Sequence, residues 1–200
     1  MIAANGPIDL GTYMRLCLTH PDHGYYTTRD TVIGRGGDFI TAPEISQLFG
    51  EMIGFWIADL WAQMGRPKRF ILAELGPGRG TLMADVVRIL SHIPGVLSAA
   101  SLHLVEVSAV LIAHQAQALQ GYDVTWYDRV DDLPHDAPLI IVNNEFFDAL
   151  PVRQYIVSPD GSWDEVVVGV DDAGALALGR RACHPGQAPQ EREPGPSAVL

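Results

Sequence analysis

The stretch from Glu74 to Gly80 reads Glu-Leu-Gly-Pro-Gly-Arg-Gly and constrains the fold more than any other part of the sequence. It places three glycines at alternate positions, shortly after the apolar run of residues 70–73. Glycine adopts left-handed backbone conformations at little steric cost and lets another group approach the main chain closely. A glycine-rich turn between a strand and a helix is typical of α/β folds that hold a nucleotide-like ligand. The stretch therefore predicts a strand, a ligand-binding turn and a helix.

From residue 69 onward, short apolar segments alternate with amphipathic ones. This alternation is typical of an α/β fold, in which a parallel sheet has helices on its faces. After Pro151 the pattern changes to short strands joined by turns, which indicates an antiparallel β meander. We expect core strands at 70–75, 102–107, 122–127 and 138–143, and helices at 80–91 and 109–120.

The N-terminal part is expected to be largely helical. Asp9 can cap a short helix that stops at His20-Pro21, because proline disfavours helix in the residue before it. The sequence Thr41-Ala-Pro-Glu44 matches a capping box, in which Glu44 is the acid of the first turn. One long helix is therefore expected from Thr41 to about Met64, with a broad apolar stripe that packs on the sheet.

These patterns divide the chain into four parts of one structural domain. Residues 1–68 are expected to form a helical and glycine-rich extension that packs on the core, and residues 69–151 are expected to form the α/β core. Residues 152–181 form the meander. Residues 182–200 are rich in proline, glycine and charge, which is typical of a disordered tail or a linker.

Composition excludes several classes of partner. The 24 acidic residues against 13 Lys and Arg give a formal net charge of −11, which disfavours nucleic acid and anionic membrane surfaces. No apolar run approaches the roughly 18 residues of a membrane span. Cys17 and Cys183 have no disulfide or metal-ligand spacing, so we expect a cytoplasmic protein. His20 and His23 have no third ligand in view, so no metal site is expected.

The residues around the glycines narrow the choice of ligand. A Walker loop is excluded, because no Gly-Lys-Ser/Thr follows at the required distance. A dinucleotide fingerprint fits imperfectly, because Thr81 occupies the position where the helix must pack closely on its strand. The pattern that fits is an acid followed by three alternate glycines, and it resembles the first motif of class I methyltransferases that use S-adenosylmethionine. The residues of this motif are Glu74, Gly76, Gly78 and Gly80.

A second acid supports this resemblance. Glu106 ends the second predicted strand, 26 residues after Gly80. In a doubly wound fold this position holds the carboxylate that accepts hydrogen bonds from ribose hydroxyls. The alternative is an exposed acid at the end of a strand. With the glycines at the right distance, we expect Glu106 to bind the ribose of the cofactor.

Longer stretches together resemble one family. These are residues 18–26, 36–51, 73–85, 104–108 and 144–154, and the chain resembles the MidA-like methyltransferases, bacterial relatives of the mitochondrial complex I assembly methyltransferase. The resemblance implies a class I methyltransferase fold, with residues 69–151 as its Rossmann-like, cofactor-binding core. It also implies S-adenosylmethionine as cofactor, with Asp38 and Phe39 in the cofactor pocket. For the mitochondrial relative, located in the matrix, it implies methylation of an arginine on a complex I subunit. Chains of the family continue well past residue 200 with further strands, so we expect an incomplete sheet without the C-terminal part.

The loop after the fourth predicted strand is the candidate catalytic segment. In a class I methyltransferase this loop lies against the sulfonium, and the protein mainly holds the reactants in line. An arginine guanidinium stays protonated and is best held by carboxylates. Glu145 resembles the first acid of the paired-glutamate loop of arginine methyltransferases, and Asp148 is a shorter stand-in for the second. We expect Asn143 to contact the cofactor and Asn144, Glu145 and Asp148 to be catalytic.

Three functions remain open at this point. The first is an S-adenosylmethionine-dependent protein methyltransferase that acts on arginine, in a complex I subunit or a similar protein. The second is a non-catalytic assembly or binding module that keeps the fold and cofactor binding. The third is a nicotinamide oxidoreductase.

Overall fold

The computed structural model describes residues 2–28, 40–183 and 186. They fall into two compact units, one with residues up to 28 and from 149 onward, the other with the residues between them. This division differs from the predicted parts, because residues 2–28 group with the meander while residues 40–68 group with the sheet. Most of the predicted tail of residues 182–200 lies outside the described residues.

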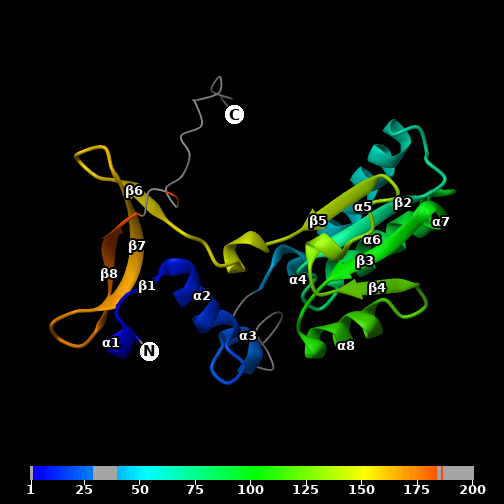
Figure 1. Ribbon diagram of the computed structural model, residues 1–200. Helices are drawn as coiled ribbons and strands as arrows, with labels where there is room; N and C mark the ends of the chain where they lie inside the picture. Colours follow the sequence, from blue (N-terminus) through cyan, green and yellow to red (C-terminus); the bar gives the residue numbers. More distant parts are fainter. Residues whose placement is uncertain (1, 29–39, 184–185, 187–200) are drawn as a thin grey trace. The chain divides into compact units, whose positions relative to one another are not determined.

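The larger unit is built on a parallel sheet with the strand order β4-β3-β2-β5 (Figure 1). Its strands are β2 (Phe70–Leu75), β3 (Ala100–Val105), β4 (Val124–Tyr127) and β5 (Leu139–Asn143). Leu75 pairs in register with Val105 and with Asn143, and Val105 pairs with Tyr127. The carboxyl ends of all four strands are therefore level, so the segments that follow them leave the sheet at one edge. The predicted parallel sheet is confirmed.

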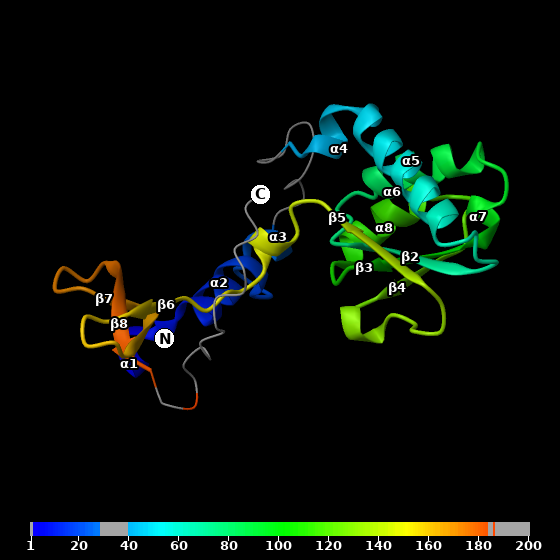
Figure 2. The ribbon, with the colours of Figure 1, turned by 90° about the horizontal axis from the view of Figure 1, so that it is seen from above.

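Within the part of the chain that the structure describes, β5 is an edge strand of this sheet. Its even-numbered residues Ile140 and Val142 are buried, while Leu139 and Ile141 are each 38% exposed. The expectation of an incomplete sheet is thus confirmed for the described residues. Figure 1 shows β5 at one side of the strand array, beside β2, and in the view from above in Figure 2 β5 lies in front of the other strands.

Helices α6 (Thr81–Ser91) and α8 (Ala109–Ala118) confirm the predicted crossover helices, with the short α7 (Val96–Ala99) between α6 and β3. Helix α6 buries one apolar face in the main core, together with apolar residues of the strands. Strand β3 ends at Val105 rather than at the predicted residue 107. The reason is local. The carboxylate of Glu106 accepts hydrogen bonds from the amides of Val107 and Ser108, which turns the chain, and the side chain of Ser108 then caps α8.

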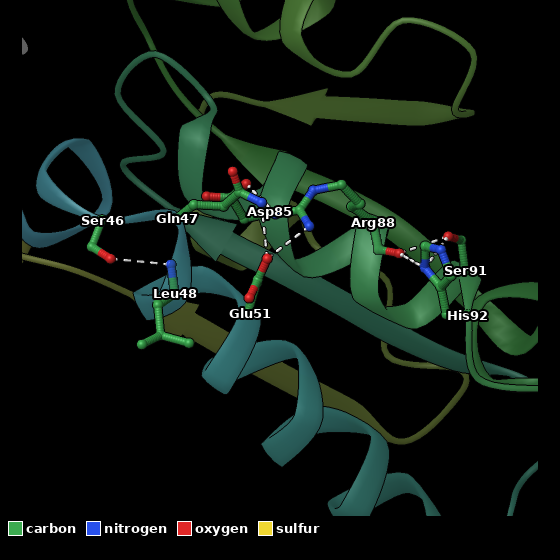
Figure 3. Close-up of polar contacts among 8 residues, drawn as sticks. All are labelled: Ser46, Gln47, Leu48, Glu51, Asp85, Arg88, Ser91 and His92. Carbon is green, nitrogen blue, oxygen red and sulfur yellow. Dashed lines mark hydrogen bonds and ion pairs between the residues drawn. The ribbon is translucent and has the colours of Figure 1, made fainter.

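The single long helix predicted from Thr41 to Met64 is wrong. It is divided into α4 (Ala42–Ile45) and α5 (Gln47–Gln63), with Ser46 in an extended conformation between them. The side-chain oxygen of Ser46 accepts from the amide of Leu48 at 3.2 Å and caps α5 (Figure 3). The predicted capping box is not formed, since Thr41 makes no side-chain cap bond. Glu44 instead accepts a hydrogen bond from the Thr81 hydroxyl at 2.6 Å.

Helix α5 packs closely on α6 because it carries glycines where the two helices meet. A Cβ on Gly50 would lie 2.5 Å from the Cβ of Asp85, and one on Gly54 would lie 3.1 Å from the Cβ of Ile89. Arg88 of α6 bonds to Glu51 of α5 and to Asp85, at 2.8 Å in each case (Figure 3). The sequence predicted that this helix packs on the sheet, whereas its close packing in the structure is on α6.

The smaller unit contains the predicted meander. Strands β6 (Tyr155–Val157), β7 (Trp163–Val170) and β8 (Leu176–Ala182) pair antiparallel, and β1 (Ile8–Asp9) adds to β7. The unit also holds the helices α1 (Ile2–Asn5), α2 (Leu10–Thr19) and α3 (Tyr25–Thr28). Asp9 caps α2 as predicted, accepting from the Thr12 amide at 2.8 Å. The remaining elements are two short 3-10 helices, η1 (Val130–Asp132) in the larger unit and η2 (Phe147–Ala149) where the chain passes from the larger unit to the smaller one.

None of the helices among the described residues is long and apolar enough to cross a membrane.

Candidate cofactor-binding site

The glycine loop follows β2 at the level edge of the sheet. Gly76, Gly78 and Gly80 have φ angles of 60°, 55° and 83°, a region that is unfavourable for other residues. The Gly76 amide donates to the carbonyl of Val105 at 3.1 Å, which ties the loop to the end of β3. Gly80 is the N-cap of α6, so the loop leads into a helix N-terminus whose free amides favour an anionic group. Each of the three predicted glycines therefore has a conformational reason to be glycine.

Glu74 lies on β2, one residue before the loop's first turn, and is buried. Burial raises the pKa of its carboxyl to about 8, although a hydrogen bond with the Met83 backbone lowers it in part. Its Oε2 atom has no hydrogen-bond partner among the described residues. A buried polar atom without a partner is costly, so this oxygen is suited to form a hydrogen bond with a bound ligand, as a donor while the carboxyl keeps its proton and as an acceptor once it is ionised.

Glu106 follows β3 directly and is also largely buried. Its Oε1 atom accepts from the amides of Val107 and Ser108, both at 2.9 Å. Burial raises the pKa of the Glu106 carboxyl, and the hydrogen bonds from Ser108, Val107 and Gln115 oppose that rise. Since Oε1 already has two donors, Oε2 is the atom with more acceptor capacity for a ribose hydroxyl.

Gln115 of α8 is a polar residue of this region that the sequence did not reveal. It is completely buried, and its Nε2 atom donates to the carbonyl of Gly78 at 2.8 Å and to Oε2 of Glu106 at 3.3 Å. Its Oε1 atom accepts from the indole of Trp126 at 2.8 Å. In the sequence it is one of two similar glutamines in an apolar segment, so only its burial distinguishes it.

The loop after β5 leaves the sheet beside the glycine loop. Asn143 is the last residue of β5, paired with Leu75, and Asn144 follows it. Glu145 is exposed and has a φ angle of 51°, an unusual conformation for a residue with a side chain. Asp148 lies in η2 and is also exposed.

Phe146 packs directly on the glycine loop. A Cβ on Gly76 would lie 2.5 Å from the ring of Phe146, which also contacts the apolar cluster around Leu75, Val105 and Leu133. Phe146 is therefore a wall of the site. Phe147 is 64% exposed and meets Phe146 edge-on, with 5.5 Å between the ring centroids.

The structure thus brings together Glu74, the three glycines, Glu106 and the segment after β5, at one edge of the sheet. Asp38 and Phe39, expected in the cofactor pocket, lie outside the described residues. Glu44 was expected only as a helix cap, yet its bond to Thr81 places it next to Gly80 at the start of α6. Among the residues described, no group of three or more His, Cys, Asp and Glu side chains could hold a metal ion.

Comparison with known proteins agrees with this geometry. A family described as "putative S-adenosyl-L-methionine-dependent methyltransferase" matches residues 52–195. The chain is 42% identical to the mitochondrial protein arginine methyltransferase NDUFAF7 of Danio rerio, over 85% of this chain and 45% of that protein. It is 40% identical to the human protein of the same name, over 85% of this chain and 43% of the human one.

A solved structure is similar over most of the chain. The crystal structure of a Burkholderia thailandensis protein bound to S-adenosyl-homocysteine has a TM-score of 0.73 and 32% sequence identity. The similarity covers 91% of this chain and 48% of that protein. The chain therefore spans less than half the length of each of these relatives.

The fold, the glycine loop and the matched residues define a class I, Rossmann-like methyltransferase unit. The chain belongs to the family of S-adenosyl-L-methionine-dependent methyltransferases whose pattern covers residues 52–195.

Proposed function

We propose that this chain binds S-adenosylmethionine and takes part in methylating an arginine of a protein substrate. The observation that carries the proposal is the meeting of Glu74, the glycine loop and Glu106 at the level ends of β2 and β3. The Oε2 of Glu74, which has no hydrogen-bond partner among the described residues, and the left-handed glycines fit a ligand that carries both a polar group and a bulky adenosine. The relative from Burkholderia thailandensis, similar over this region, was solved with S-adenosyl-homocysteine.

The residues have separate tasks in this proposal. The glycine loop and the N-terminus of α6 hold the amino-acid end of the cofactor, where free amides favour its carboxylate. Glu106 accepts from the ribose through Oε2, and Asn143 at the end of β5 contributes a polar contact beside the loop. The cofactor, when bound, supplies a methyl group activated by its positive sulfur.

The segment after β5 is proposed to orient the substrate. Glu145 and Asp148 supply carboxylates that can hold a protonated guanidinium, and Asn144 can fix one of its nitrogens by hydrogen bonding. The left-handed backbone at Glu145 costs free energy and is the kind of strain found at functional sites. The relatives named arginine methyltransferase support arginine as the target, and a respiratory complex I subunit is the proposed substrate class.

Isothermal titration of the 200-residue chain tests cofactor binding. We expect S-adenosylmethionine and S-adenosyl-homocysteine to bind and NAD to give no heat of binding. Preference for NAD would replace the proposal with an oxidoreductase. Absence of binding by all three ligands at millimolar concentration would refute cofactor binding by this chain.

Methyl transfer from labelled cofactor to arginine-bearing complex I subunits or peptides tests the enzymatic part. Glu145→Gln keeps size but loses the charge-assisted contact, so we expect transfer to fall by about two to three orders of magnitude. Affinity for S-adenosyl-homocysteine should stay unchanged, because the cofactor contacts belong to other residues. Asp131→Asn, which neutralises an exposed acid in η1, is the matched control and should leave both quantities unchanged. Transfer at the parent rate by Glu145→Gln would make Glu145 structural.

The exposed positions of Glu145 and Asp148 favour one alternative, a binding module that holds the cofactor without catalysis. The two functions differ in a single result. Cofactor binding without transfer to any arginine-bearing acceptor, under conditions in which a full-length relative transfers methyl, would establish the binding module.

A further inference from the structure

Gln115 connects three separate parts of the site. Its Nε2 atom bonds to the glycine loop at Gly78 and to Glu106 after β3, and its Oε1 atom bonds to Trp126 on β4. Its backbone also touches the loop, because a Cβ on Gly80 would lie 3.1 Å from the Cα of Gln115. Helix α8 therefore meets the ligand-binding loop at this residue.

The chemistry of the partners determines how the Gln115 amide is oriented. An indole nitrogen only donates and a backbone carbonyl only accepts, so the amide oxygen must face Trp126 and the amide nitrogen must face Gly78. The second hydrogen of the same nitrogen is then directed to the carboxylate of Glu106. An amide satisfies all three partners at once, whereas a carboxylate would face two acceptors.

We propose that Gln115 is a positioning residue of the cofactor site. It holds the Gly78 peptide and the Oε2 atom of Glu106 at a fixed separation, so that loop and ribose acceptor face the ligand together. The proposal rests on the proposed binding of S-adenosylmethionine. It adds a residue that contacts two predicted cofactor-binding positions and that no sequence motif indicated.

The effect on Glu106 has a definite direction. Its Oε1 atom is held by two backbone amides regardless of Gln115, but the orientation of Oε2 depends on the bond from Nε2. A donor to a carboxylate stabilises its charged form and lowers its pKa. Loss of this donor should therefore weaken ribose binding, and weaken it more at low pH.

The first test measures affinity for S-adenosyl-homocysteine by isothermal titration at pH 5.5 and pH 8. Gln115→Met keeps length and burial but removes all three hydrogen bonds. We expect it to bind about tenfold more weakly at pH 8, on the scale of one hydrogen bond to a charged group, and more weakly still at pH 5.5. Gln117→Met, an exposed position on the same helix, is the matched control and should bind like the parent.

Two further variants separate positioning from packing. Trp126→Phe removes the indole donor but leaves both bonds from Nε2, so its affinity should change less than threefold. Gln115→Glu places a second carboxylate beside Glu106. At pH 8 the two carboxylates repel each other, but at lower pH the new side chain can take up a proton and donate a hydrogen bond. Its affinity should therefore recover at pH 5.5, the opposite trend to Gln115→Met. Thermal unfolding of each variant shows whether it is folded.

The outcomes test the positioning role of Gln115 separately from cofactor binding itself. If the parent binds and Gln115→Met binds within twofold of it at both pH values, Gln115 has no positioning role. An equal, pH-independent loss in Gln115→Met and Gln115→Glu would make the residue merely structural. If Gln115→Met does not fold, the reversed pH trend of Gln115→Glu still supports the proposal, and its absence refutes it. A parent that does not bind S-adenosyl-homocysteine refutes the proposed function and this inference with it.

Discussion

The carboxyl of Glu74 should make the stability of the larger unit depend on pH near neutrality. Burial raises its pKa to about 8 in the folded chain, against 4.5 as the ordinary value. A raised pKa means that the folded state retains a proton that the unfolded state has lost. The stabilisation is complete below about pH 4.5 and is lost as pH rises through about 8.

The magnitude follows from the width of that interval. One pKa unit corresponds to about 1.4 kcal/mol, so the free energy of unfolding should fall by about 1.4 kcal/mol per pH unit and by about 5 kcal/mol in all. Glu74→Gln is neutral at every pH and close in shape to the protonated acid. The free energy of unfolding of the parent, minus that of Glu74→Gln, should therefore be close to zero at pH 5 and become steadily more negative up to pH 8.

Urea unfolding followed by circular dichroism at pH 5, 6, 7 and 8 measures this difference. Other groups such as His103 and Glu106 also titrate, but they are present in both proteins and cancel in the comparison. Glu51→Gln is the control. In the parent, the hydrogen bond from Arg88 lowers the pKa of Glu51, so this carboxylate is ionised throughout the range and the difference between parent and control should not change with pH. A parent-to-Glu74→Gln difference that does not change between pH 5 and pH 8 would refute the reasoning.

Three further predictions concern single residues. Glu106→Ala should bind S-adenosyl-homocysteine about tenfold more weakly, since it loses an acceptor to the ribose; equal affinity by isothermal titration would remove Glu106 from that role. Glu145→Gly should raise the free energy of unfolding by about 1 kcal/mol, because glycine tolerates the left-handed φ of 51°; a loss of stability in urea would show that the side chain is needed for folding. Gly50→Ala should cost about 1–3 kcal/mol, because its Cβ would lie 2.5 Å from that of Asp85, and a thermal midpoint equal to the parent's would show that α5 can move away from α6 freely.

The local pattern of the chain was sufficient for most elements. The core strands, the crossover helices and the meander follow from apolar periodicity, and the cap of α2 follows from Asp9. The exception is the helix expected from Thr41 to Met64. The capping-box motif is present in the sequence, but two other contacts decided the local structure. Ser46 caps a separate helix, α5, and Glu44 bonds to Thr81 of α6.

The sequence by itself determined which residues can form the ligand loop, because the left-handed angles at Gly76, Gly78 and Gly80 are a local demand that glycine meets. Only the tertiary structure decided the charge state of Glu74 and the role of Gln115. Gln115 reaches a carbonyl 37 residues away, and Glu74 owes its raised pKa to the helix and strands that bury it. Such properties depend on desolvation and on contacts between distant segments, which apolar periodicity along one segment does not specify.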